Sequence, residues 1–341
     1  MVRNKRVIFR CFKKLRVKTC TIKRYSAADY GRWNEFIAKA KNATFLFHRD
    51  FMEYHADRFQ DFSLIVCDGD KWLAVLPAHV ENGRVYSHRG LTYGGLVIDN
   101  SIRLAEMIVV FRQLLQYLNG ENIQFLHLSL IPPIYHHFPS DEIKYALFLA
   151  DAVLERRDAL AVIDQDHPML ATKNRRNSIR RGAKYGLEIR EDNDFRIFWT
   201  KILIPNLANK HGVKPVHTIE EIERLHALFP QNIRHFNVYD NDRIVAGTTV
   251  FESELVAHPQ YVSGREDKNA LGSIDYLYSY LITEVFSEKK FFDFGISNEK
   301  QGRKLNEGLI FWKESFGART IAHDFYEVRT ANYHNLDNVL I

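Results

Sequence analysis

Residues 291–319 read FFDFGISNEKQGRKLNEGLIFWKESFGAR and carry the clearest structural signal in the chain. Phe291 to Phe294 is a β-prone run, and it predicts a short strand that ends at Gly295. Apolar residues then recur at the spacing of one helix face: Leu305, Leu309, Trp312 and Phe316. Gly317 supplies a helix stop. The stretch therefore predicts a strand, a polar loop and a helix.

Polar side chains gather around this loop, namely Asp293, Ser297, Asn298 and Asn306. Loops held between a rigid strand and a helix are where polar groups are aimed at substrates. Asp293 could act as a base or an orienting group, or it could cap the loop. Asn298 and Asn306 suit amide or carbonyl recognition, with a loop or capping role as the alternative. Lys313, beside Glu314, could steady a charged intermediate or carboxylate, or lie on the surface without a function.

Length and composition indicate two folded units. The chain has 341 residues, of which 46% are hydrophobic and 13% aromatic, enough for two cores. No run of about 18 uninterrupted apolar residues occurs, so we expect no transmembrane segment. Met1 to Lys18 is basic and predicts a disordered or surface-lying arm rather than a secretory signal. We expect a protein of the cytoplasm without a disulfide framework, because the three cysteines are scattered: Cys11, Cys20 and Cys67. Metal-ligand spacing is missing, so we expect no structural metal.

The two halves of the chain follow one plan of helices, three antiparallel strands, a long helix and a further strand. Turn signals separate the first strands, predicted at 62–67, 72–79 and 84–88, and a second meander is predicted at 233–239, 244–251 and 260–263. Strands predicted at 147–154 and 159–163 end the first half, and residues 164–168 form the boundary. The fold class predicted is α+β (mixed α/β), with one lobe over 19–166 and another over 167–330.

Residues 89–96 contain three glycines but lack the order of a dinucleotide site. They predict either a loop that lines a cleft or a plain turn.

A basic helix is predicted from Lys173 to a stop at Gly186. Arg176, Arg180 and Lys184 lie three or four residues apart and so share one face. This face is either solvated or binds a phosphate-bearing substrate, linked to a nucleotide or carried on RNA.

The long helix of the second half begins near Ser273, its predicted N-cap. Apolar residues recur along it at 274, 277, 278, 281, 282, 285 and 286. The free amide groups at such a helix start form a natural anion site.

The Asp-Phe-Gly at 293–295, the Leu-Asn-Glu-Gly-Leu at 305–309 and the Lys-Glu-Ser-Phe-Gly-Ala-Arg at 313–319 together resemble the C-terminal signature of the FemAB-like transferases. These proteins are relatives of the GNAT acyltransferases, and many attach amino acids to peptidoglycan precursors. The resemblance implies two GNAT-like lobes, each a mostly antiparallel mixed sheet flanked by helices. It also implies an acyl- or aminoacyltransferase whose acceptor is an amine of a cell-envelope precursor or sugar.

The donor implied by the resemblance is acyl-coenzyme A in some branches and aminoacyl-tRNA in the peptidoglycan branch. In GNAT enzymes a glycine-rich helix start holds the coenzyme A pyrophosphate. The matching residues here are Lys268, Gly272 and Ser273, with one glycine where two are expected. This departure leaves room for aminoacyl-tRNA.

The chemistry expected is direct attack of an amine, because neither a Gly-x-Ser-x-Gly elbow nor a Cys-His pairing is present. In GNAT-like folds splayed central strands bind the reacting carbonyl, and residues 258–263 are the best match for that place. Tyr261 could then protonate the leaving group, or simply belong to the core. The alternative is a module without catalysis that binds an anionic ligand.

Overall fold

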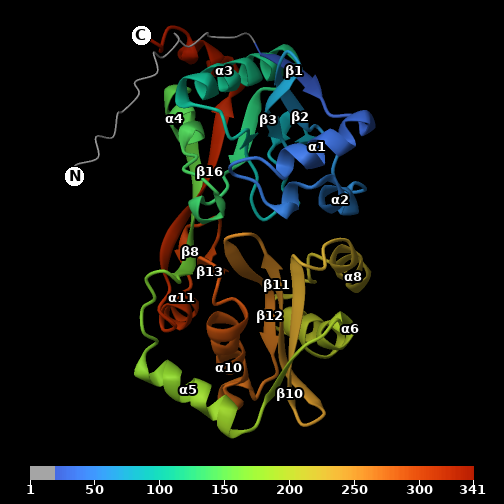
Figure 1. The fold of residues 1–341 in the computed structure, drawn as a ribbon, viewed down its shortest axis with the longest axis vertical. Helices are drawn as coiled ribbons and strands as arrows, with labels where there is room; N and C mark the ends of the chain where they lie inside the picture. Colours follow the sequence, from blue (N-terminus) through green and yellow to red (C-terminus); the bar gives the residue numbers. More distant parts are fainter. Residues whose placement is uncertain (1–19) are drawn as a thin grey trace, which may run out of the picture.

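The computed structural model describes residues 20–341, which form two lobes stacked along the long axis (Figure 1). The predicted basic arm at Met1 to Lys18 and Cys11 lie outside the described residues. Among residues 20–341, no helix has the length and apolar character needed to cross a bilayer.

The first lobe contains a four-stranded antiparallel sheet in the order β1-β2-β3-β6. The strands are β1 (Thr21–Arg24), β2 (Leu64–Asp68), β3 (Lys71–Leu76) and β6 (Val97–Ile98). The helices of this lobe are η1 (Ala27–Asp29), α1 (Tyr30–Ile37), η2 (Phe45–Phe47), α2 (Arg49–Met52), η3 (Glu53–His55), α3 (Leu104–Gly120), η4 (Pro133–Tyr135) and α4 (Glu142–Leu149).

A ten-stranded mixed sheet runs through both lobes in the order β4-β5-β7-β16-β8-β13-β12-β11-β10-β9. From the first lobe come β4 (His79–Glu81), β5 (Arg84–Tyr86), β7 (Phe125–Ser129) and β8 (Val153–Asp164). The later part of the chain adds β9 (Glu188–Glu191), β10 (Ile233–Asp240), β11 (Arg243–Glu252), β12 (Val256–Gly264), β13 (Phe291–Ile296) and β16 (Arg319–Arg329). A small hairpin, β14 (Asn298–Glu299) with β15 (Lys304–Leu305), follows β13.

The helices of the second lobe are α5 (Lys173–Lys184), α6 (Phe195–Phe198), the π-helix η5 (Trp199–Leu203), α7 (Ile204–His211), α8 (Ile219–Leu228), α9 (Lys268–Leu271), α10 (Ser273–Tyr280), the π-helix η6 (Leu281–Val285) and α11 (Glu307–Glu314). Ser273 is the first residue of α10 rather than its cap, because Gly272 holds the cap position in the left-handed region (φ 69°). The mixed α/β class and the sheets flanked by helices agree with the sequence prediction.

Two strands belong to both lobes. β16 pairs with β8 from Arg319 to Glu327, and its last residues, Phe325 to Arg329, also pair with β7. The chain then ends in η7 (Thr330–Leu336), which packs with α3 in the core of the first lobe. The division into 19–166 and 167–330 stays a prediction. The C-terminal end of the range 167–330, in β16, lies within the first lobe, where it pairs with β7.

One predicted strand is wrong. Residues 147–149 belong to α4, and the strand predicted at 159–163 is part of the single long strand β8. The helix forms because Ile143, Ala146 and Leu147 recur at helical spacing and are buried against the core that contains α3. A short apolar run without alternation fits either a strand or a helix, so the spacing of its apolar residues could not distinguish the two.

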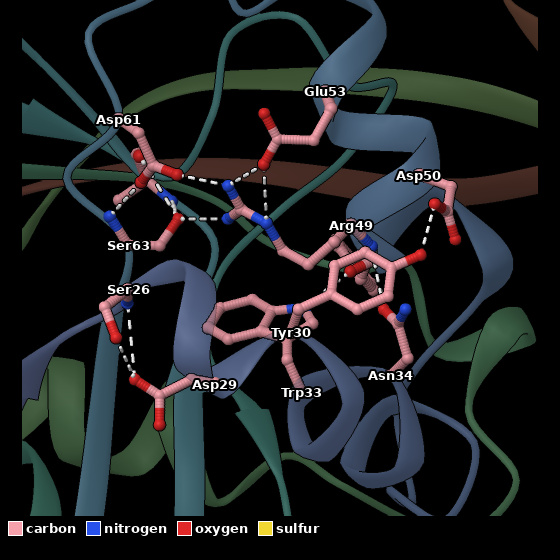
Figure 2. A network of polar contacts seen from close by, with 12 residues as sticks. Ser26, Asp29, Tyr30, Trp33, Asn34, Arg49, Asp50, Glu53, Asp61 and Ser63 are labelled. Atoms are coloured by element: carbon pink, nitrogen blue, oxygen red, sulfur yellow. Dashed lines mark hydrogen bonds and ion pairs between the residues drawn. The ribbon is translucent and has the colours of Figure 1, made fainter.

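A buried guanidinium links several segments of the first lobe (Figure 2). The side chain of Arg49 is 3% exposed, forms ion pairs with Glu53 and Asp61, and donates to Ser63 Oγ at 3.2 Å. Its guanidinium also lies 3.8 Å from the ring centre of Tyr25. Arginine suits this place because its planar fork binds two carboxylates and stacks on a ring at the same time.

Candidate active site

A cleft of about 1010 Å³ opens where the two lobes meet. Six strands line it: β5, β7, β8, β12, β13 and β16. Figure 1 shows β8 and β13 near the place where the lobes meet. The loop at 89–96, predicted either to line a cleft or to be a plain turn, supplies Arg89 and Leu91 to Tyr93. The turn after Phe294 supplies Gly295 and Ile296.

The floor of the cleft forms where two parallel strands separate. β12 and β13 pair only at Val256 with Phe291 and at Ala257 with Phe292. The next residues are His258 on β12 and Asp293 on β13, and both line the cleft. His258 Nδ1 donates to the backbone oxygen of Asp293 at 3.0 Å and thereby bridges the gap.

The carboxylate of Asp293 is 1% exposed and has a partner for each oxygen. Oδ1 accepts from the Gly295 amide at 2.7 Å, and Oδ2 accepts from the Tyr135 hydroxyl at 2.8 Å and lies 3.4 Å from His258 Nδ1. Burial acts to raise the pKa of Asp293, but the hydrogen bonds and His258 outweigh it, and the pKa lies below its usual value. Burial and the adjacent carboxylate raise the pKa of Tyr135 well above its ordinary value, so the tyrosine stays a donor. Asp293 is therefore an ionised group held in place.

This arrangement leaves one nitrogen of His258 for a ligand. Because Nδ1 donates to Asp293, the neutral ring has its lone pair on Nε2, which makes no hydrogen bond to a described residue. Gln260 also lines the cleft, and its Oε1 is buried without a partner among the described residues. The floor thus offers a proton acceptor beside an unsatisfied amide oxygen.

Lys313 lies behind the floor rather than in the cleft. Its side chain is buried, and Nζ donates to the backbone oxygens of Gly295 at 2.9 Å and Ile296 at 2.5 Å. Burial lowers its pKa to about 8. Lys313 therefore fixes the turn that carries the cleft wall.

The part of the cleft formed by β8, β16 and β7, which follow β13 in the same sheet, is polar and largely paired. Arg156 donates to both oxygens of the buried Asp158 and lies 4.4 Å from the ring centre of Phe325. His323 Nε2 lies 3.2 Å from Ser129 Oγ. Burial lowers the pKa of His323 to about 4, so its ring is neutral at pH 7.

One group near the rim has ligand types suited to a metal. His127, Glu155 and Glu327 each offer an atom within 4.8 Å of the others. However, Arg84 donates to Glu327 at 3.0 Å and lies 3.3 Å from His127 Nε2. A guanidinium thus already neutralises the carboxylate.

Of the residues predicted for catalysis, Asp293 alone lines the cleft. The Tyr261 hydroxyl lies 2.5 Å from His217 Nδ1 within the core, on the far side of β12. Asn306 is the exposed N-cap of α11 and accepts from the Leu309 amide at 3.0 Å. Asn298, predicted to bind substrate, accepts from the Ala159 amide at 2.6 Å and joins the hairpin to β8. Their predicted roles stay predictions.

The residues predicted for the cofactor lie under α5. Ser273 is fully buried, and a Cβ on Gly272 would approach the Ser178 backbone oxygen of α5 to 2.3 Å. A carbonyl oxygen against the helix start does not suit a pyrophosphate, so this place does not fit coenzyme A as it stands. The roles of Lys268, Gly272 and Ser273 remain a prediction, and α5 would have to move for them.

The basic residues predicted to bind substrate lie on the outer face of α5. Arg176, Arg180 and Lys184 are exposed, and none of them lines the cleft. In Figure 1, α5 lies at the end of the second lobe, away from the central strands.

Sequence reasoning missed His258, Gln260 and Tyr135. The first two lie two residues apart on the strand already chosen from the resemblance, and alternation places them on the face opposite Tyr261. That pattern could have identified them. Tyr135 comes from η4, more than a hundred residues before Asp293, and no local pattern signals the contact.

No family model and no curated protein sequence matches this chain. Solved structures do match it in fold. FemX aligns over 93% of this chain and 99% of its own, with a TM-score of 0.65 and 10% identity.

Two further structures align over 91% of this chain, each with 12% identity. One is the C-terminal domain of a protein from Agrobacterium fabrum that is described as a lysylphosphatidylglycerol synthetase, with a TM-score of 0.58 over 95% of its length. The other is L-PGS from Bacillus licheniformis, with a TM-score of 0.57 over 94% of its length. The fold of this chain is therefore similar to that of FemX over nearly the whole of both chains, which agrees with the resemblance to FemAB-like proteins found in the sequence.

Proposed function

We propose that this protein transfers an acyl or aminoacyl group to an amine held in the cleft, by direct attack with both substrates bound. The observation that carries the proposal is His258, oriented by the buried Asp293, with its Nε2 unused at the point where β12 and β13 separate. A histidine held this way, with one ring nitrogen facing the cleft, has the geometry of a general base.

In the proposed reaction the neutral amine attacks the donor's carbonyl carbon, and a C–N bond forms. His258 Nε2 accepts the proton that the amine loses. The bond from the carbonyl carbon to the leaving oxygen or sulfur then breaks, and His258 returns the proton to that atom. Asp293 keeps its charge throughout and stabilises the protonated ring, while Tyr135 and Lys313 hold Asp293 and its turn.

The proposed substrates are supported by the sequence resemblance and by the likeness in fold to FemX. We infer an amine of a cell-envelope precursor or sugar as acceptor, and acyl-coenzyme A or aminoacyl-tRNA as donor, in the cytoplasm. The contact between α5 and Gly272 favours aminoacyl-tRNA, because the place expected for a pyrophosphate is covered.

The test compares His258→Ala with His167→Ala, a matched change at an exposed histidine outside the cleft. Both proteins are assayed for donor consumption with a panel of acyl-coenzyme A and aminoacyl-tRNA donors and amine acceptors. Loss of a general base costs roughly 10²–10⁴-fold in kcat. We expect that loss for His258→Ala and unchanged activity for His167→Ala.

A protein that consumes no donor with any acceptor would contradict the proposal. If it binds an anionic ligand without turnover, and His258→Ala does not alter that binding, the alternative of a module without catalysis is favoured.

A further inference from the structure

The outer face of α5 is cationic without being neutralised by the protein. No acidic residue occurs between His167 and Leu187, while five exposed basic residues lie on α5: Lys173, Arg176, Arg180, Arg181 and Lys184. None of the five forms an ion pair with another residue in the range 20–341. Arg176 and Arg180 make only local contacts, to the Ala171 backbone oxygen and to Asn177 Oδ1. These positive charges are therefore available to an anionic partner.

The opposite face of α5 is packed against the rest of the second lobe, and these contacts fix the orientation of the cationic face. Arg175 points inward, forms an ion pair with Asp275 and donates to Ser315 Oγ at 2.8 Å. Further along, a Cβ on Gly182 would approach Tyr276 Cβ to 2.4 Å, so the helix backbone lies directly against α10. One face of α5 is thus fixed to the lobe, and its cationic face is directed outward.

Large apolar side chains flank the same helix. Leu170 is 90% exposed and Met169 50% exposed just before α5, and Tyr185 is 57% exposed just after it. The segment before the helix is held in place, because the Thr172 amide donates to the Ser315 oxygen at 2.9 Å and the Met169 backbone lies against Gly317. Exposed apolar groups beside a row of cations are the features of a helix that lies on a membrane surface.

We propose that α5, with Met169 and Leu170, docks this protein on an anionic lipid bilayer. The basic side chains would contact lipid phosphates, and Leu170 and Met169 would enter the boundary of the acyl chains. A second copy of the chain fits less well, since the five cations would face one another. RNA would satisfy the cations but would leave Leu170 in water. None of these residues lines the cleft, so docking here leaves the cleft open. The proposal does not depend on the chemistry inferred for the cleft.

The test measures binding of the full chain to vesicles of phosphatidylcholine alone and with phosphatidylglycerol, at low and high salt. We expect binding only with the anionic lipid, and weaker binding at high salt. Joint substitution Arg176→Gln, Arg180→Gln and Lys184→Gln should weaken it about a hundredfold. Leu170→Ser should weaken it about tenfold.

The matched control removes the same charge from exposed residues of other helices or their ends, by Lys39→Gln, Lys201→Gln and Arg224→Gln. It should bind as the unmodified protein does. All substituted side chains are exposed, so unchanged thermal unfolding serves as the folding check. The proposal is overturned if the unmodified protein does not bind the anionic vesicles, or if the control variant loses as much affinity for them as the α5 variant does. It is also overturned if Leu170→Ser keeps full vesicle binding while the α5 variant loses affinity for bulk tRNA, which would identify an RNA surface.

Discussion

At the scale of single residues, Asp293 and Lys313 are both buried near the turn after Phe294, but they have different roles. Asp293 lines the cleft as an ionised carboxylate, whereas Lys313 holds the turn from behind with a pKa of about 8. The sequence identified both as polar groups near one loop. It did not show which would face the cleft, because that depends on Tyr135 and His258 from distant elements.

Replacing Lys313 by Met should destabilise the protein by about 1–3 kcal/mol, because the backbone oxygens of Gly295 and Ile296 lose their buried donor. Urea unfolding measures the change. Lys304→Met, an exposed change in the same segment, should cost a few tenths of a kcal/mol, as is usual for surface positions. Equal losses in the two variants would show that the turn does not depend on Lys313.

Stability should fall as the pH decreases from about 6.5 towards 4. Burial lowers the pKa of His79 and of His217 to about 4, so both are neutral in the folded protein. The unfolded chain then binds more protons than the folded one in this window, and protonation favours unfolding. The free energy of unfolding, measured by urea between pH 7.5 and 4.5, should show this decline. His79→Phe should make it shallower, and an unchanged slope would remove His79 from the explanation.

At the scale of elements, the sequence predicted the strongly patterned segments well. The basic helix predicted from Lys173 to a stop at Gly186 is α5, whose N-cap Thr172 accepts from the Arg175 amide, and the meander of β10 and β11 lies within a residue of its predicted bounds. The prediction failed at 147–154, where a short apolar run forms the end of α4. Element type there is set by packing on α3, which local propensity cannot supply.

Asn306 allows capping and catalysis to be told apart. If it acts as the cap of α11, Asn306→Ala should cost about 1 kcal/mol in the free energy of unfolding and leave the turnover rate unchanged below the unfolding transition. Asn306→Asp should restore the stability, because an aspartate oxygen caps as well. A loss of turnover of a hundredfold in the folded Ala variant would instead support the catalytic role predicted from the sequence.

At the scale of the whole molecule, the two lobes are joined by more than a linker. β8 and β16 belong to the sheet that continues through both, and one apolar core contains residues of each, such as Phe47 and Phe198. The ring centre of Phe45 in the first lobe lies 5.6 Å from that of Phe229 and 5.7 Å from that of Phe251 in the second. The same order of helices and strands in both halves of the sequence suggested two separate units. Local periodicity does not show which strands pair, so it could not indicate that the lobes share a sheet.

We therefore expect a single cooperative unfolding transition. Calorimetry should give equal calorimetric and van't Hoff enthalpies, because neither lobe keeps its sheet without β16. Val328→Asp, in the first-lobe part of β16, should lower this one transition for both lobes, whereas Arg319→Asp, exposed on the same strand, should change it little. Two resolved transitions would show that the lobes are thermodynamically independent.

The shared strands also constrain how the cleft can work. β8 and β16 both line the cleft and pair with each other in the sheet that runs through both lobes, so swinging the lobes together or apart would break strand pairs. Hinge closure, a common way for an enzyme to keep water from a reactive donor, is then not available to this scaffold. In the proposed reaction, water would instead be excluded by the acceptor as it fills the space above His258. Hydrolysis of the donor should then be fastest when the acceptor is scarce.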